Sequence, residues 1–529
     1  VKGLTFGQTL GYSREKTVGL GNTNSEFGGP LSSAINLDPI TPAVVTDPTV
    51  ANLPPYSNQN GIMRDANGNP YGISQVVTQE MSNPLAYTKA RLGNYGLADN
   101  FVGNAYLELE AIPGLKIRST LGGKLAYWGG DTFTPVFYFN STAINAVNSL
   151  SRNSNTGFGW NIENTISYTK QIADHNFSIL VGQGSYVDNK TSGSTVTYKN
   201  LPVDTYDEAT FNFGATEDNK TASAYDGYEH IVTSLFSRLT YDYKQKYLLT
   251  GIIRRDGSSR FGQNNKYGTF PSFSAGWVPS RENFWPENKV VNQLKIRGGY
   301  GITGSDAIGD FKYLSTIGAG RNYTIGDQGS VTVGNSPNAP SNPDLKWEET
   351  SQANIGFDAT LFNDFNLTVD FYNKKTTGIL QDIDLPGHVG SNGRPSANIA
   401  DMENKGVDLE LGYRKKLGDF NLSVNGNISY LENKVTYLGN GINFISGDAS
   451  FQSMGAVTRT QVGQSVNSFY GFEYDGVFQN QAQINNYRNA AGGLILPNAQ
   501  PGDFIWKDLN GDGTISDADK TFIGNPLPK

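Results

Sequence analysis

The sequence predicts an all-β protein: the wall of a transmembrane antiparallel β-barrel, with short turns at one edge and long loops at the other. Two observations lead to this prediction. Apolar and polar residues alternate with a period of two over many segments, as in strands with one apolar and one wet face. The 529 residues include 62 glycines, 28 tyrosines and 28 phenylalanines but only 4 methionines, a composition typical of strands joined by many turns.

The alternation is clearest in the second half of the chain. In residues 352–361 and 365–372, apolar side chains occupy every second position, and the same pattern returns at 407–414 and 420–430. The apolar positions are Ala353, Ile355, Phe357, Ala359, Leu361, Phe365, Leu367, Val369, Phe371, Val407, Leu409, Leu411, Tyr413, Phe420, Leu422, Val424, Ile428 and Tyr430. None is Lys or Arg, whose exposure to lipid at mid-membrane costs about 2–4 kcal/mol. We therefore expect this face to meet lipid and the opposite face, with Asp358, Glu410 and Arg414, to be solvated.

Short turns and long polar segments alternate along the chain. Tight turns are predicted at 113–114, 172–174, 244–246, 363–364 and 418–419. Long segments rich in Asn, Ser, Gly, Thr and Asp are expected at about 15–98, 129–157, 189–229, 304–347, 379–403 and 436–462. All short turns then lie at one edge, which is typical of periplasmic turns and extracellular loops. No helical periodicity of useful length is present.

Composition excludes several function classes. The net charge of -8 leaves no basic excess for a nucleic-acid partner. The absence of cysteine excludes disulfides, thiolate metal sites and a cysteine nucleophile, and three histidines leave little material for a zinc site or a triad. No apolar run approaches the ~18 residues of a transmembrane helix. The first residues read as the middle of a strand rather than a signal peptide.

Alternative architectures stay open at this point. Tandem soluble β-sandwiches also alternate, but their strands usually recur with loops of similar length at both edges. A solenoid should show a fixed repeat of about 20–50 residues, and none is visible.

Several motifs resemble a known family. Residues 254–277 (RRDGSSRFGQNNKYGTFPSFSAGW) resemble a signature of the SusC/RagA-like TonB-dependent outer-membrane transporters of the Bacteroidota. Further similar segments follow in the family's order, at 294–305, 342–362, 365–380, 404–414, 468–480 and 501–529. The resemblance is specific over most of residues 231–529 and general in style over residues 1–230.

The resemblance implies a 22-strand barrel with an N-terminal plug, in the outer membrane of a Gram-negative bacterium. It implies TonB-dependent uptake of oligosaccharides or peptides, with a SusD-like surface lipoprotein as a lid. We count about fourteen strands, so we expect residues 1–529 to be an internal barrel portion. The plug, the TonB-contacting segment and the last strands would lie outside this sequence. The expected partners are the lipoprotein, TonB, outer-membrane lipid and the substrate, without nucleic acid. A passive porin-like or adhesive barrel without TonB coupling is the alternative, followed by a soluble β adhesin.

One loop is a candidate calcium site. Residues 508–519 (DLNGDGTISDAD) match the spacing of a calcium loop, with Gly513 at the sharp turn. The oxygen ligands would be Asp508, Asn510, Asp512, the carbonyl of Thr514, Ser516 through water, and Asp519. The alternative is an Asx-rich turn between two strands. We expect no required cofactor, and calcium only in a structural role.

Two other motifs favour structural interpretations. Gly299, Gly301 and Gly304 spell G-x-G-x-x-G, but a dinucleotide site needs a helix after the strand, and a polar loop follows here. In the signature segment, Arg255, Asp256, Arg260 and Asn264 could form a binding site, but a hairpin tip held by an Arg–Asp pair is the simpler interpretation. No set of nucleophile, base and acid stands out, nor any marked pair of carboxylates for glycoside hydrolysis. We therefore predict that the protein is not an enzyme.

Overall fold

The computed structural model describes residues 3–20, 29–77, 81–286, 289–325, 330–383, 385–386, 388, 392–439, 441–447 and 455–528. Two compact units can be distinguished. The first comprises Val1–Leu109, Arg118–Asn164 and Gly184–Ile231, and the second comprises Glu110–Ile117, Thr165–Gln183 and Val232–Lys529.

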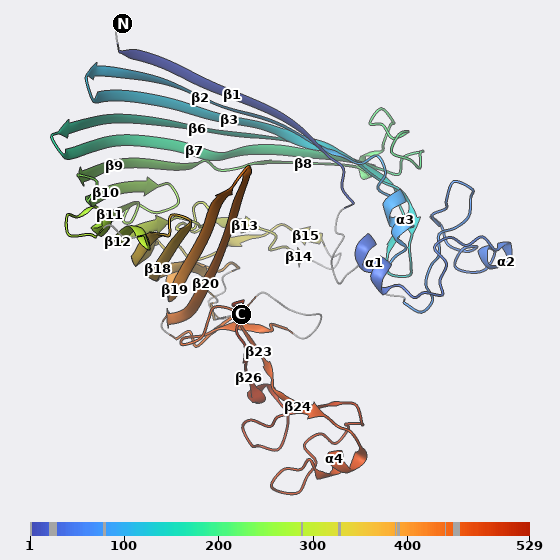
Figure 1. Ribbon diagram of the computed structural model, residues 1–529. Coiled ribbons are helices and arrows are strands. Elements are labelled where there is room, and N and C mark those ends of the chain that lie inside the picture. The colour runs from blue at the N-terminus through green and yellow to red at the C-terminus, as the bar shows by residue number, and fades with distance from the viewer. Residues whose placement is uncertain are drawn as a thin grey trace. The chain divides into compact units, whose positions relative to one another are not determined.

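The dominant element is a fourteen-stranded sheet with the order β1-β2-β3-β6-β7-β9-β10-β11-β12-β17-β18-β19-β20, in which β8 pairs separately with β7. The strands appear in chain order along the sheet, as a chain of hairpins requires. The bounds are β1 (Leu4–Thr17), β2 (Gly96–Ile112), β3 (Leu115–Thr134), β6 (Ser149–Ile172), β7 (His175–Lys199), β8 (Lys220–Asp226), β9 (His230–Tyr243), β10 (Tyr247–Ser258), β11 (Tyr267–Trp277), β12 (Val291–Ser305), β17 (Glu348–Leu361), β18 (Phe365–Asp382), β19 (Ser396–Leu417) and β20 (Phe420–Leu438). Figure 1 shows β1, β2, β3, β6 and β7 as long arrows side by side, with β1 beginning at the N label.

The predicted tight turns join the paired strands. Lys244 and Gln245 have φ values of 52° and 53°, and β9 and β10 pair in register on either side of them. Phe362 and Asn363, with φ of 54° and 62°, likewise join β17 to β18. Two successive left-handed residues match the right-handed twist of the flanking strands, which holds each hairpin in register.

Cross-strand register confirms the predicted division of faces. Ile355 lies opposite Phe371, Phe371 opposite Val407, and Val407 opposite Tyr430, so the apolar positions of β17 to β20 form continuous rows on one face. Ile355 is 61% exposed because no described part of the chain covers it. Its surroundings must come from outside the described chain.

The strands extend further at the long-loop edge than the alternation predicts. The segments expected at 129–157, 189–229, 379–403 and 436–462 contain the ends of β3, β6, β7, β19 and β20. Polar residues interrupt both faces of these strand ends and the apolar residues among them do not alternate over several positions, so no pattern reveals them. The predicted bounds of these long segments were wrong because alternation of apolar and polar residues indicates that one face of a strand meets lipid or a core, and does not indicate strand pairing itself.

The long segments carry their own small cores. In the first unit, Phe133, Leu150 and Leu201 form one buried cluster, and Ala86, Ala90 and Phe139 form another. In the second unit, Phe261, Phe270, Leu345 and Trp347 pack together above the β10–β11 hairpin. The long segments are therefore folded onto the strand ends over the described residues.

The remaining elements are short. The helices are α1 (Pro30–Asn36), α2 (Pro48–Ala51), α3 (Pro84–Lys89) and α4 (Gln481–Asn486), with 3-10 turns at Glu217–Asn219, Pro279–Arg281 and Asp517–Asp519. The minor strands are β4 (Phe137–Tyr138), β5 (Ile144–Asn145), β13 (Ile317–Ala319), β14 (Tyr323–Ile325), β15 (Ser330–Thr332), β16 (Asn335–Pro337), β21 (Ile445–Ser446), β22 (Thr458–Thr460), β23 (Ser468–Phe472), β24 (Tyr474–Val477), β25 (Phe504–Trp506) and β26 (Lys520–Gly524). Over the described residues, no helix has the length and apolar character needed to cross a membrane.

A carboxylate fastens the connection between β11 and β12 at the short-turn edge. Glu282 pairs with Lys246 Nζ at 2.9 Å and accepts a hydrogen bond from Trp277 Nε1 at 3.2 Å. A hydrogen bond from Tyr247, followed by the one from Lys246, lowers the pKa of Glu282 to about 2. This ion pair holds the connection against the β9–β10 turn.

Candidate lumenal site

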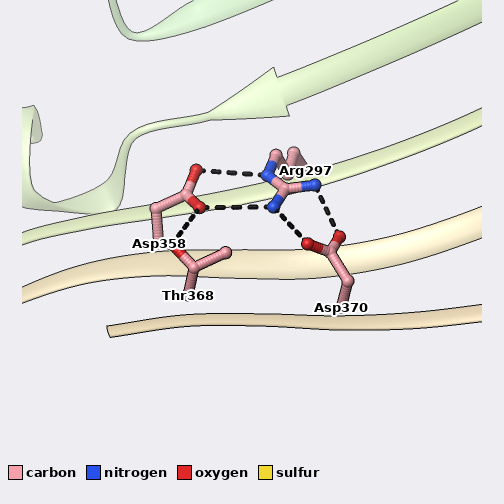
Figure 2. A network of polar contacts seen from close by, with 4 residues as sticks. All are labelled: Arg297, Asp358, Thr368 and Asp370. Carbon is pink, nitrogen blue, oxygen red and sulfur yellow. Dashed lines mark hydrogen bonds and ion pairs between the residues drawn. The ribbon is translucent and has the colours of Figure 1, made fainter. Parts of the chain in front are cut away.

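A network of charges lies on the polar face of β12, β17 and β18. The Arg297 guanidinium makes two hydrogen bonds to Asp370, both 2.6 Å, and two to Asp358, at 3.1 and 3.3 Å. The Thr368 hydroxyl donates to Asp358 at 3.2 Å. Figure 2 shows the guanidinium between the two carboxylates, with Thr368 completing the group. Planar, two-point pairing of this kind is the strong geometry for Arg and carboxylate.

The strand register and one glycine position this network. Asp358 lies opposite Thr368 in the β17–β18 pair, and Arg297 lies opposite Gly356, which itself lies opposite Asp370. A Cβ on Gly356 would come within 2.5 Å of Asp370 Oδ1 and 2.6 Å of the Val369 carbonyl oxygen. The missing side chain at 356 therefore lets Arg297 reach across β17 to a carboxylate two strands away.

An open pocket of about 300 Å³ adjoins the network, lined by Thr250, Ser274, Lys295, Arg297 and Asn354 among others. Arg297 is engaged by its two aspartates, whereas the Lys295 ammonium has no carboxylate within ion-pair distance in the described part of the chain. The pocket thus offers one unpaired cation and several hydroxyl and amide groups. It can bind polar ligands, and it contains no nucleophile paired with a base.

The sequence predicted only part of this arrangement. Asp358, Glu410 and Arg414 were expected on the wet face; Asp358 joins the network, and Glu410 and Arg414 are solvent-exposed. Arg297 was not singled out, although it is two residues from Lys295 in an otherwise apolar-alternating strand. The signal in the sequence that could have identified Arg297 is the presence of two cations on the polar face of one strand.

The signature segment forms a braced hairpin tip. Arg254 pairs with Asp256 at 2.8 Å, and Arg260 pairs with Asp310 at 3.0 Å. Asn264 donates to Asp344 Oδ1 at 3.0 Å. The Arg260 and Asn264 bonds tie the β10–β11 tip to two later loops, in agreement with the interpretation of a hairpin tip held by an Arg–Asp pair.

The three glycines of the G-x-G-x-x-G motif all lie within β12, and the segment directly after the strand, residues 306–316, contains no helix. A Cβ on Gly304 would lie 2.1 Å from the Phe270 ring, and one on Gly301 would lie 2.9 Å from Ser272 Cβ. The glycines make room for side chains of β11. The motif does not form a nucleotide site.

The candidate calcium loop has an ordered backbone organised by its own carboxylates. Asp508 accepts hydrogen bonds from the amides of Gly511 and Gly513, both at 2.8 Å, and Gly513 has φ of 83°. Asp512 accepts from the Thr514 amide and hydroxyl, which lowers the pKa of Asp512.

The last position of this loop faces inward. Asp519 is fully buried and accepts backbone hydrogen bonds from Ser516, Leu509 and Asn510, and the Ser516 amide contributes most to lowering its pKa. Over the described residues, no group of three or more His, Asp or Glu side chains is arranged to hold a metal ion. The loop therefore shows the Asx-rich turn, and calcium ligation stays a prediction.

Comparison with known proteins identifies the family. The sequence matches the family described as TonB dependent receptor-like, beta-barrel, over residues 47–516. The chain belongs to this family. It is a SusC/RagA-like member, and its strands are those of an outer-membrane β-barrel of a Gram-negative bacterium.

Individual relatives of this receptor barrel agree. TonB-dependent receptor P26 of Formosa agariphila is 32% identical over 487 residues, covering 90% of this chain and 47% of the relative. TonB-dependent receptor SusC of Bacteroides thetaiotaomicron is 27% identical over 534 residues, covering 96% of this chain and 48% of the relative. The structure of the RagAB peptide transporter superposes with a TM-score of 0.69 at 22% identity, covering 87% of this chain and 48% of that chain. The chain spans about half the length of the relatives it matches.

The family assigns the two faces of the sheet. In such barrels, outward side chains meet lipid and inward side chains line the lumen. The apolar rows of β17 to β20 are therefore the lipid-facing surface. The Arg297 network and its pocket are part of the lumenal wall.

Proposed function

We propose that this chain forms part of the wall of a TonB-dependent importer that carries oligosaccharides or peptides across the outer membrane. The observation that carries the proposal is the division of faces on β12 to β20. The same strands present apolar rows to lipid and an Arg297–Asp358–Asp370 network to the lumen. A charged, hydrated inner wall suits a polar cargo.

The lumenal pocket supports this cargo class. Lys295, Thr250, Ser274 and Asn354 offer donors and acceptors that suit hydroxyl, amide or carboxylate groups. Both oligosaccharides and peptides carry such groups. RagAB is described as a peptide transporter, and the relative from Bacteroides thetaiotaomicron is SusC. We therefore keep both oligosaccharides and peptides as proposed substrate classes.

The proposed partners follow from the same relatives. A SusD-like surface lipoprotein would cover the long-loop edge, where the strand ends and their small cores lie. TonB would act through a plug segment supplied outside the described strands. Members of the family are transporters and receptors, and we propose no catalytic activity for this chain.

For the loop 508–519 we propose a calcium ion in a stabilising role only. Asp508 Oδ2 and Asn510 Oδ1 each accept one backbone hydrogen bond and retain a lone pair. Asp512 Oδ1 accepts two hydrogen bonds from Thr514, so the carboxylate would bind the ion through Oδ2, which accepts one. The Thr514 carbonyl and Ser516 would complete the ligand set. Asp519 would contribute by fixing the loop, because its carboxylate is turned toward backbone amides.

The deciding experiment is uptake by intact cells. Cells expressing the protein would receive fluorescent oligosaccharides and fluorescent peptides in separate assays, with and without TonB and with and without a co-expressed SusD-like lipoprotein. We expect one cargo class to accumulate, and accumulation to cease when TonB is removed. Uptake that continues at the same rate without TonB would replace this proposal with the passive-pore alternative.

A further inference from the structure

A cavity of about 650 Å³ lies among the long segments of the first unit. Its lining comes from residues within 60–64, 89–93, 133–136 and 204–207, none of which lines the pocket beside Arg297. Contacts between backbones bring these segments together, since the Tyr138 amide donates to the Gly61 carbonyl at 2.8 Å. The volume falls within the range of ligand pockets, about 300–1,000 Å³. The cavity is therefore large enough for a small ligand.

Part of the cavity wall is apolar and belongs to the small cores of the long segments. Ala90 and Phe133 are 5% and 3% exposed and are members of two different buried clusters. Met63 packs against the first cluster, and Tyr206 packs against the second. A Cβ on Gly93 would lie 2.4 Å from the Tyr206 ring, so the glycine leaves room for this side chain. The cavity thus offers an apolar surface held between two cores.

Four charged residues line the same cavity, two of each sign. Arg64 and Lys89 supply the cations, and Asp204 and Asp207 supply the carboxylates. All four residues are exposed, so a ligand from solvent can reach them. The Lys89 ammonium donates to the Arg64 carbonyl, and the Arg64 guanidinium donates to the Gly68 carbonyl at 3.0 Å. These neutral acceptors position the two cations without cancelling their charge.

The charges of the cavity form no ion pair with one another or with other residues of the described chain. The ion pairs found in this unit join other side chains, among them Arg14–Asp99, Arg118–Glu108, Arg152–Asp131, Lys190–Glu229 and Lys220–Glu217. Asp65, which follows Arg64, accepts hydrogen bonds from the amides of Asn67 and Asn69 at 2.9 and 2.8 Å. Unpaired charges of both signs around one cavity favour a ligand that carries both signs itself.

We propose that this cavity binds a short peptide by its two charged ends. The α-carboxylate would lie at Arg64 and Lys89, the α-ammonium at Asp204 and Asp207, and an apolar side chain against Phe133. Charge-assisted hydrogen bonds of this kind are stronger than those between neutral groups. A neutral oligosaccharide carries no group that matches either pair of charges. Peptide is one of the two cargo classes proposed above, but binding here is measured without TonB, so a negative result would leave the uptake proposal in place.

The test compares free and blocked forms of one tripeptide on the full protein purified from outer membranes in detergent. The probe is Ala-Leu-Ala, and saturation-transfer NMR, which suits weak binding of a small ligand, gives its Kd. N-acetylation removes the ammonium, and C-terminal amidation removes the carboxylate. Each single block should weaken binding about fivefold, the upper end of the effect of an exposed ion pair. A doubly blocked peptide that binds as tightly as the free one would overturn the proposal.

Variants assign each end of the peptide to its own pair of residues. Asp204→Asn combined with Asp207→Asn should weaken binding of the free peptide about fivefold and leave that of the N-acetylated peptide unchanged. Arg64→Gln combined with Lys89→Gln should weaken the free peptide equally and leave the amidated one unchanged.

The matched controls are Asp218→Asn and Lys199→Gln, two exposed charges of the same unit that do not line the cavity. Losses no larger than those of the controls, or equal losses for free and blocked peptides, would contradict the assignment. Heat-modifiable mobility on gels reports that each variant is folded.

Discussion

The Arg297 network offers the sharpest test of the lumenal wall. Replacing Arg297 by methionine removes four hydrogen bonds and leaves Asp358 and Asp370 facing one another without a cation. Side-chain exposures of 27%, 37% and 23% place the three residues between surface and interior. Exposed pairs contribute about 0.2–1 kcal/mol, and breaking a buried pair costs about 3–5 kcal/mol. We therefore expect a loss of about 2 kcal/mol in the free energy of unfolding.

The assay is denaturant unfolding in detergent micelles, followed by tryptophan fluorescence. Lys295→Gln is the control because it removes a cation from the same face of β12 that has no ion-pair partner in the described chain. Its expected effect is within about 0.5 kcal/mol. A combined variant with Arg297→Met, Asp358→Asn and Asp370→Asn should recover most of the loss, since no uncompensated charge remains. Equal losses for Arg297→Met and Lys295→Gln would refute the reasoning.

Three further predictions concern other parts of the chain. The pKa of Glu282 is lowered to about 2 in the folded protein, so its stabilising contribution should be complete above an unfolded pKa of about 4.3 and disappear as pH falls toward 2. Glu282→Gln should therefore flatten the pH dependence of the free energy of unfolding between these two values, and an unchanged pH profile would contradict the assignment. Gly356→Ala should cost about 1–3 kcal/mol because its Cβ would overlap Asp370 and the β18 backbone, whereas Gly426→Ala, which meets nothing within 4 Å, should be neutral in the same unfolding assay. Calcium should raise the melting temperature of the wild type and of Asp517→Ala but not of Asp508→Ala, and calorimetry with and without chelator that shows no shift in the wild type would remove the calcium hypothesis.

Part of the candidate site could be predicted from the sequence, and part of it could not. The wet face of β17 and β18 follows from alternation, so Asp358 and Asp370 could be placed on one face without coordinates. Arg297 belongs to a different strand, 61 residues before Asp358 in the chain. Its reach across β17 depends on Gly356, and a glycine in a strand does not by itself indicate which neighbour fills its space. The ion pairs of Arg297 could therefore not be predicted from the sequence.

The strand ends show the same division. Alternation identifies a strand only where one face meets lipid or a core, so β6, β7 and β19 were predicted too short. Their outer ends are held by pairing between polar segments and by small cores, of which Phe133, Leu150 and Leu201 join distant parts of the chain. Hydrogen-bonded pairing needs no apolar pattern, and so leaves none in the sequence.

By itself the sequence determined the antiparallel sheet of hairpins, the positions of its short turns and the face that meets lipid, because each follows from local alternation and turn chemistry. The tertiary structure decided which charges meet across strands, how the long segments fold over the strand ends, and how the loop 508–519 uses its carboxylates. These depend on register and on contacts between residues far apart in the chain. Local sequence carries the periodicity of a strand, but only the assembled sheet fixes which residues of neighbouring strands share a row.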